Sequence, residues 1–432
     1  MTGRQFYDWQ TAGGADDVMR MVDALERAEL SVNLHGRSQV SLQLSIEDFY
    51  REFPSRAVAA DVHGILPTLV RLASCMAFWL ACLRPAEAEP GFHIYAPIKE
   101  TKQLLVIAAT PGADGLDLAV QETRDIDCGG GAIAAHPVKP LLYVMGSGGR
   151  PHQVKSTVLE LDDRGAVARE TPFNAELGCV YARTDPTGRC LLTADYGTGA
   201  VDVYPLDEAG LPGPRAESRV AGAKMAHAVG VSPDGRFVYV PHVKQHNALF
   251  QYALDRDTGT LTPLDPPDAA PAEGIGPRHV AFHPTLPVVY FTNEQQLGVS
   301  AYTRGADGRL ALLAICDAVD ASLEKVRKSA SASDIVITPD GKFVFTGLRG
   351  HGVACDFVAR FRVRDDGRLE LLGRTPVDKL PWGFALSPDG GHLVVAAFEG
   401  KSITAYRIAA DGDLATAGRL DCGRKITQVV TR

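Results

Sequence analysis

The chain has 432 residues, 45% of them hydrophobic and 22% charged, with a formal net charge of −8 at pH 7. This acidic balance argues against a nucleic-acid partner, because such proteins usually carry a basic stripe. The eight cysteines show no Cys-x-x-Cys pair and no zinc-ligand spacing, so we expect reduced thiols and no metal. The sequence also has no P-loop and no dinucleotide-binding fingerprint, so we expect no cofactor.

Residues 1–90 form the first distinct segment. Helical spacing is visible in residues 15–30 and 45–53, and residues 65–83 are apolar except for Arg71, which disfavours a stable membrane span. Segment 65–88 ends in a small-x-small pattern and is similar to a secretory signal peptide, although about 60 residues precede it. Either translation starts downstream and the protein is periplasmic, or residues 1–90 are a helical or disordered extension of a cytoplasmic protein.

Three short β-patterned runs follow at residues 92–96, 104–108 and 116–121. After them a turn signature recurs about every 50 residues, which is typical of a propeller or another stacked repeat. Its prolines are Pro137, Pro186, Pro233, Pro284, Pro339 and Pro388.

Each signature lies between two apolar runs and in several units reads Pro-Asp-Gly, a tight hairpin turn. An Asp-Gly or Asp-Thr-Gly turn follows about 25 residues later in four of the units. Two hairpins make a four-stranded blade. Six blades alone would leave two exposed edges. We therefore predict an all-β, seven-bladed β-propeller over residues 91–432, in which one blade joins the three N-terminal runs to a C-terminal strand at residues 426–430.

The repeat also predicts where functional side chains gather. Counted from the turn proline, position −6 begins the inner strand and position +10 ends its hairpin partner, so both lie at the blade end opposite the turn. Charged or titratable residues occupy these positions in three consecutive units only: His227, Arg278, Glu294 and Arg349. If these residues are purely structural, His227 is a buried core histidine and Arg278 forms an ion pair with Glu294 between strands. A functional reading favours an anionic substrate with a carbonyl group, since arginines bind anions and stabilise an oxyanion while Glu or His moves a proton.

The residues around these positions carry a family resemblance. The stretch Gly-Pro-Arg-His ending at His279, followed by Asn293-Glu294 and preceded by Pro-His-Val-Lys ending at Lys244, resembles the seven-bladed propeller lactonase family. That family contains bacterial propeller 6-phosphogluconolactonases and is similar to fungal carboxymuconate lactonizing enzymes. The resemblance covers about residues 91–432, but residues 317–331 form an insertion and residues 350–356 an unusually glycine-rich loop.

The resemblance implies a metal-independent catalytic site made by His227, Arg278, Glu294 and Arg349, with Lys244, His279 and Asn293 as substrate-binding residues, although Lys244 could also be a solvated rim lysine. It implies hydrolysis of a sugar lactone, best of all 6-phospho-D-glucono-1,5-lactone in the pentose phosphate pathway, with Glu294 or His227 activating water. Alternatives are a carboxymuconate-type lactonizing isomerase and a non-enzymatic ligand-binding propeller. The expected partner is a small anionic lactone, and we expect a monomer.

Overall fold

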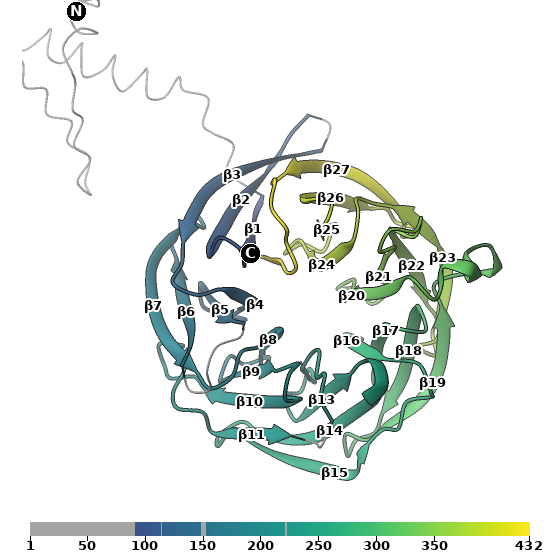
Figure 1. Ribbon diagram of the computed structural model, residues 1–432, viewed down its shortest axis with the longest axis horizontal. Coiled ribbons are helices and arrows are strands. Elements are labelled where there is room, and N and C mark those ends of the chain that lie inside the picture. Colours follow the sequence, from purple (N-terminus) through teal and green to yellow (C-terminus); the bar gives the residue numbers. More distant parts are fainter. Residues whose placement is uncertain (1–90, 114, 148–152, 221–222) are drawn as a thin grey trace, which may run out of the picture. The chain divides into compact units, whose positions relative to one another are not determined.

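Seven four-stranded antiparallel sheets form a ring of blades (Figure 1), so the predicted β-propeller is confirmed. The computed structural model describes residues 91–113, 115–147, 153–220 and 223–432. The predictions for residues 1–90 lie outside the described residues. Within the described ranges, no helix is long and apolar enough to cross a membrane.

The blades are numbered in chain order, starting from the blade that contains β1. The strands of each blade are named in the order in which they lie in the sheet. Blade 1 combines the two ends of the described chain, as β28 (Val430–Thr431), β1 (Phe92–Ile98), β2 (Gln103–Pro111) and β3 (Leu116–Asp125). In chain order, blade 2 is β4 (Gly130–Ala135), β5 (Leu141–Gly146), β6 (Val154–Leu161) and β7 (Val167–Ala175), and blade 3 is β8 (Tyr181–Thr184), β9 (Cys190–Ala194), β10 (Ala200–Pro205) and β11 (Glu217–Val220).

Blade 4 is β12 (Gly230–Val231), β13 (Phe237–His242), β14 (Ala248–Asp255) and β15 (Thr260–Asp268), and blade 5 is β16 (Pro277–Phe282), β17 (Val288–Asn293), β18 (Gly298–Arg304) and β19 (Leu310–Asp317). Blade 6 is β20 (Ser331–Ile337), β21 (Phe343–Arg349), β22 (Phe357–Val363) and β23 (Leu369–Pro376), and blade 7 is β24 (Pro381–Leu386), β25 (His392–Ala397), β26 (Ser402–Ile408) and β27 (Leu414–Asp421). Among the described residues, two short 3-10 helices lie in connections, η2 (Lys244–His246) and η3 (Ala321–Val326).

In blades 4, 6 and 7 the residue before the turn proline explains why the first hairpin is tight. In blade 4 the Ser232 hydroxyl oxygen accepts a hydrogen bond from the Phe237 backbone N–H at 2.9 Å. Thr338 does the same for Phe343 at 3.0 Å in blade 6, and Ser387 for His392 at 2.9 Å in blade 7. A short side-chain oxygen thus satisfies a backbone donor within the turn, which fixes the register of the two inner strands.

The hydrophobic core lies between neighbouring blades rather than inside one blade. In one cluster Tyr290 of blade 5 packs with Phe361 of blade 6. A second contact repeats around the ring: a second-strand tyrosine hydroxyl donates to the glycine carbonyl in the outer turn of the next blade, as for Tyr290 and Gly367 at 2.9 Å. The other pairs of this kind are Tyr95 with Gly165, Tyr143 with Gly210, and Tyr239 with Gly308. Two of the Asp-Gly turns read from the sequence, at Gly308 and Gly367, therefore also join blades.

The C-terminal strand differs from its prediction in length and position. It covers Val430 and Thr431, which lie opposite Tyr95 and Ile94 of β1, instead of residues 426–430. The preceding residues make other contacts. The Gln428 amide oxygen accepts from the Ile133 backbone at 3.0 Å, and its amide nitrogen donates to the Val180 carbonyl at 2.6 Å. This segment therefore connects to blades 2 and 3 before the chain pairs with β1.

Candidate active site

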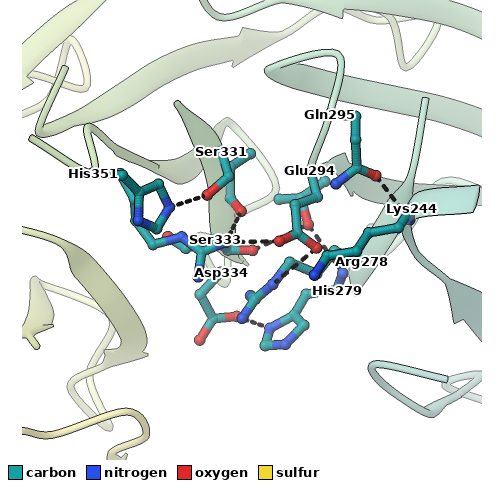
Figure 2. Close-up of polar contacts among 12 residues, drawn as sticks. Lys244, Arg278, His279, Glu294, Gln295, Ser331, Ser333, Asp334 and His351 are labelled. Atoms are coloured by element: carbon teal, nitrogen blue, oxygen red, sulfur yellow. Dashed lines mark hydrogen bonds and ion pairs between the residues drawn. The ribbon is translucent and has the colours of Figure 1, made fainter. Parts of the chain in front are cut away.

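The positions selected by the repeat register meet at one end of the ring, where first strands begin and second strands end. Arg278 lies on β16, Glu294 directly follows β17, and Arg349 is the last residue of β21. His227 lies just before β12, and its backbone N–H donates to the Pro241 carbonyl at 3.0 Å. We call the group Tyr196, His227, Arg278, Glu294, Arg349 and Trp382 the mouth. Figure 2 shows Arg278 and Glu294 pointing toward each other.

Two β-bulges determine which side chains reach the mouth. The pairing of β16 with β17 shifts between Pro277 and Val280, so one extra residue is inserted where Arg278 and His279 lie. The pairing of β20 with β21 shifts in the same way between Ala332 and Ile335, around Ser333 and Asp334. A bulge re-aims side chains that would otherwise alternate across a strand. It therefore allows two adjacent residues of each strand to serve one site.

Glu294 lies between the two arginines. Its Oε1 is 3.1 Å from Arg349 Nη2, and its Oε2 is 3.9 Å from Arg278 Nε. All three residues are buried, with exposed fractions of 8% for Glu294, 1% for Arg278 and 2% for Arg349. With two guanidinium groups and one carboxylate, the cluster has an excess positive charge that suits an anionic ligand or a developing oxyanion.

Arg349 is held more firmly than Arg278. Its Nη2 also donates to the Ala332 carbonyl at 2.7 Å, and its guanidinium carbon lies 4.3 Å from the centre of the Trp382 ring. Burial and the charge of Arg278 lower the pKa of Arg349 to about 9, partly offset by Glu294. The guanidinium still carries its charge at neutral pH. Burial likewise lowers the pKa of Arg278, again offset by Glu294.

His227 is the imidazole that the repeat register places at the mouth. Burial and the charges of Arg278 and His279 hold the pKa of His227 well below its ordinary value of 6.5. The ring is therefore neutral at pH 7 and can accept a proton. It packs edge-on against Tyr196, with ring centres 5.8 Å apart.

His279 forms a pair with Asp334, a residue that the sequence did not single out. The carboxylate oxygen Oδ1 is 2.7 Å from His279 Nδ1, and Oδ2 accepts from the Phe384 backbone at 2.9 Å. Although burial raises the pKa of Asp334, the His279 contacts and the Phe384 N–H outweigh it, and the pKa lies below its ordinary value. An ionised Asp334 accepts a hydrogen bond from the Nδ1–H group of His279, which leaves the lone pair of His279 on Nε2. The His279 and His227 rings are 5.2 Å apart.

Unsatisfied polar atoms concentrate at this place. Six of the twelve buried side-chain atoms without a hydrogen-bond partner in the described part of the chain belong to five residues at this place: His227 Nδ1, Arg278 Nε and Nη1, His279 Nε2, Glu294 Oε2 and Arg349 Nε. Leaving such atoms unpaired costs roughly 1–3 kcal/mol each, so a cluster of them points to a bound water or ligand. No group of three or more His, Cys, Asp or Glu side chains suited to a metal occurs within the described ranges.

Two predicted substrate-binding residues lie apart from this cluster. Asn293 is fully buried, and its amide group donates to Gln296 at 2.8 Å and accepts from Ser300 at 2.9 Å. Both ends of the amide are thus used to hold the β17–β18 turn, and we leave Asn293 out of the site. Lys244 is exposed at the start of η2, and its ammonium group lies 5.8 Å from the centre of the Tyr196 ring.

Comparisons with known proteins find relatives named 6-phosphogluconolactonase. A 6-phosphogluconolactonase of Cronobacter sakazakii is 34% identical over 251 residues, which cover 56% of this chain and 71% of that protein. The 6-phosphogluconolactonase of Klebsiella pneumoniae subsp. pneumoniae is 31% identical over 299 residues, covering 68% of this chain and 85% of that protein.

A solved structure of similar fold is the periplasmic gluconolactonase of Pseudomonas aeruginosa, with a TM-score of 0.68, 21% identity, and coverage of 79% of this chain and 98% of that chain. A family model described as "Lactonase, 7-bladed beta-propeller" matches residues 121–429. Because this match spans most of the chain and agrees with the observed blades, the chain belongs to the seven-bladed β-propeller lactonase family.

Proposed function

We propose that this protein hydrolyses a sugar lactone at the mouth, with 6-phospho-D-glucono-1,5-lactone as substrate and 6-phosphogluconate as product. Family membership supports a lactonase, and relatives about 30% identical are named 6-phosphogluconolactonase. The single observation that carries the proposal for this site is the cluster of six buried, unpartnered polar atoms on five residues. Such a cluster costs stability unless a ligand satisfies it.

In the proposed reaction the arginines act on the carbonyl oxygen. Water attacks the lactone carbonyl carbon, and negative charge develops on that oxygen. Arg278 has two unpartnered N–H groups and Arg349 has one, so both can donate to the oxyanion without breaking an existing bond. Donors already in place act strongly in a buried site because they need no reorganisation when charge develops. No metal is required for this step.

His227 is the proposed general base. Glu294 forms ion pairs with both arginines, and Arg349 occupies its Oε1. Within the described residues its Oε2 has no hydrogen-bond partner, and neither has His227 Nδ1, but the His227 ring is neutral at pH 7 and has a lone pair for a water proton. It takes one proton from the attacking water. When the ring C–O bond breaks, the imidazolium returns this proton to the leaving ring oxygen, which becomes a hydroxyl group.

His279 and Asp334 are proposed as positioning residues. The 2.7 Å contact fixes the His279 tautomer, and the ring packs against His227 at 5.2 Å. Asp334→Asn removes the ionised acceptor and allows the other tautomer. We expect kcat to fall about 10-fold or more, less than the roughly 10²–10⁴-fold that the proton transfer itself contributes, with a shifted acid limb of the pH profile. A loss of folded protein alone would leave the profile of the remaining activity unchanged, which would refute the positioning role.

The proposed activity is tested with the purified full chain. Lactone generated enzymatically from glucose 6-phosphate is supplied, and ring opening is followed by acid release above the spontaneous rate. We expect clear acceleration on the phosphorylated lactone. A muconolactone serves as the comparison substrate for the isomerase reaction. Turnover of the muconolactone alone, or of neither substrate, would overturn the proposal.

A further inference from the structure

A basic groove adjoins the mouth. It has a volume of about 510 Å³ and is lined by Lys244, Gln295, Arg327, Lys328 and Ala330. Its size falls within the ordinary range of small-molecule sites, about 300–1,000 Å³. Three of the five lining residues are cationic and none is acidic. We call this feature the Lys244–Lys328 groove.

The groove and the mouth share a wall. Gln295 directly follows Glu294 in the chain, and its amide oxygen accepts from the Lys244 backbone N–H at 2.9 Å. The Lys244 ammonium group lies over the Tyr196 ring, which in turn packs against His227. Figure 2 shows Lys244 extending beside Arg278 and Glu294. A ligand in the groove can therefore reach the proposed catalytic groups with its other end.

The connection between β19 and β20 is anchored so that it presents Lys328 to the groove. Asp320 accepts from the Ser322 backbone at 2.9 Å at the start of η3, and Val326 at its end is buried. Arg327 donates to the Gln296 carbonyl and forms ion pairs with Glu324 at 3.0 Å and Asp317 at 3.4 Å. The charge of Arg327 is thus already compensated within this segment. Its contacts fix the position of the next residue, Lys328.

Lys244 and Lys328 differ from Arg327 because their charges are not compensated by a carboxylate among the described residues. Within the described residues, neither the Lys244 nor the Lys328 ammonium group has a carboxylate partner within 4.0 Å, and both residues are exposed. Ammonium groups bind phosphate as compact point charges. A phosphate monoester carries nearly two negative charges at neutral pH. Two unpaired ammonium groups beside a side-chain amide match this charge.

We infer that the Lys244–Lys328 groove binds the phosphate of a phosphorylated lactone and so determines the preference for phosphorylated over neutral substrates. This inference rests on the proposed lactonase function. In 6-phospho-D-glucono-1,5-lactone the carbonyl carbon and the carbon that bears the CH2-phosphate are both bonded to the ring oxygen, so the phosphate and the carbonyl lie at the same edge of the ring. Because the groove adjoins the mouth, a phosphate in the groove leaves the carbonyl within reach of the buried arginines. The insertion at residues 317–331, which sets this chain apart in sequence, supplies Lys328, one of the two lysines of the groove.

The test compares two substrates, 6-phospho-D-glucono-1,5-lactone and phosphate-free D-glucono-1,5-lactone, on the full chain and on Lys328→Met. Loss of one charge contact of about 1.4 kcal/mol corresponds to a tenfold change. We expect KM for the phosphorylated lactone to rise about tenfold with kcat little changed, so that the preference in kcat/KM for this substrate falls about tenfold. Lys325→Met is the matched control, because Lys325 is exposed on η3 but does not line the groove.

The outcomes test phosphate binding in the groove and the proposed lactonase activity independently. If Lys328→Met hydrolyses both lactones with the wild-type preference, the groove inference is overturned and the lactonase function stands. If the wild-type chain hydrolyses neither lactone, the proposed function fails. The groove is then judged by calorimetric titration with 6-phosphogluconate: binding that weakens in Lys328→Met but not in Lys325→Met supports it, and no binding, or equal binding by both variants, overturns it.

Discussion

Replacing Arg278 by methionine tests whether Arg278 acts in catalysis or only stabilises the fold through its ion pair with Glu294. Arg278 is 1% exposed, and within the described residues its ion-pair contact is the 3.9 Å approach to Glu294. At an effective dielectric constant of about 20, this distance corresponds to an attraction of about 4 kcal/mol. Removing one such ion from water costs several kcal/mol, and two of its nitrogens have no acceptor. The attraction between Arg278 and Glu294 and the cost of removing the Arg278 charge from water are thus of similar size.

Methionine fills most of the same space without a charge, so Arg278→Met should change the free energy of unfolding little, or raise it. The same substitution should lower kcat/KM about 100-fold or more, the usual effect of losing one donor to an oxyanion. This corresponds to about 2.7 kcal/mol of transition-state stabilisation. The assays are initial rates on the phosphorylated lactone and denaturant unfolding of the same preparation.

Arg360→Met is the matched control. Arg360 lies on β22, away from the mouth, and pairs with Asp413 at 2.8 Å. We expect near wild-type kinetics from this variant. An Arg278→Met protein that is clearly destabilised yet retains more than half of the wild-type kcat/KM would show that Arg278 is a structural ion-pair partner and would remove it from the site.

Three further predictions concern proton transfer, metals and ring closure. Burial and neighbouring charges hold the pKa of His227 below 6.5, so activity should be full at neutral pH and fall in acid, with a midpoint of the kcat/KM profile below 6.5. A midpoint above 7, or an unchanged acid limb in His227→Gln, would contradict the assignment of His227 as the base. Excess EDTA should leave the rate unchanged, since arginines supply the positive charge; a loss reversed by calcium or zinc would show a metal site. Deleting residues 425–432 removes β28 and the Gln428 contacts and should cause aggregation by exposing strand edges, whereas a chain beginning at Glu89 should stay soluble and active by size-exclusion chromatography and rate assay.

The local chemistry of the turns made the propeller predictable. Each Pro-Asp-Gly turn, with a Ser or Thr before it, satisfies its own backbone groups within a few residues, as Ser232 and Thr338 do. The recurrence of such turns indicates the blade length, and the strand period of two then places positions −6 and +10 at one end of the blade. For this reason His227, Arg278, Glu294 and Arg349 could be selected together from sequence.

The bulges could not be predicted in this way. A strict register selects Ser333 at position −6 of blade 6, but the extra residue in β20 brings Asp334 into contact with His279, 55 residues away in the sequence. The polar run around Ser333 was the only visible signal. A bulge changes which face a side chain occupies without changing the turn spacing, so the repeat pattern gives no sign of it.

What the sequence by itself determined is the repeat, the number of blades and the end of the ring at which charged residues collect, because these depend on turns and alternation within one blade. Contacts between blades were decided by the tertiary structure alone: the stacking of Arg349 on Trp382, the bridging by Gln428, and the placement of Lys328 beside Lys244. These pairs are brought together by closure of the ring and by the anchoring of an insertion, and neither leaves a periodic signal in the chain.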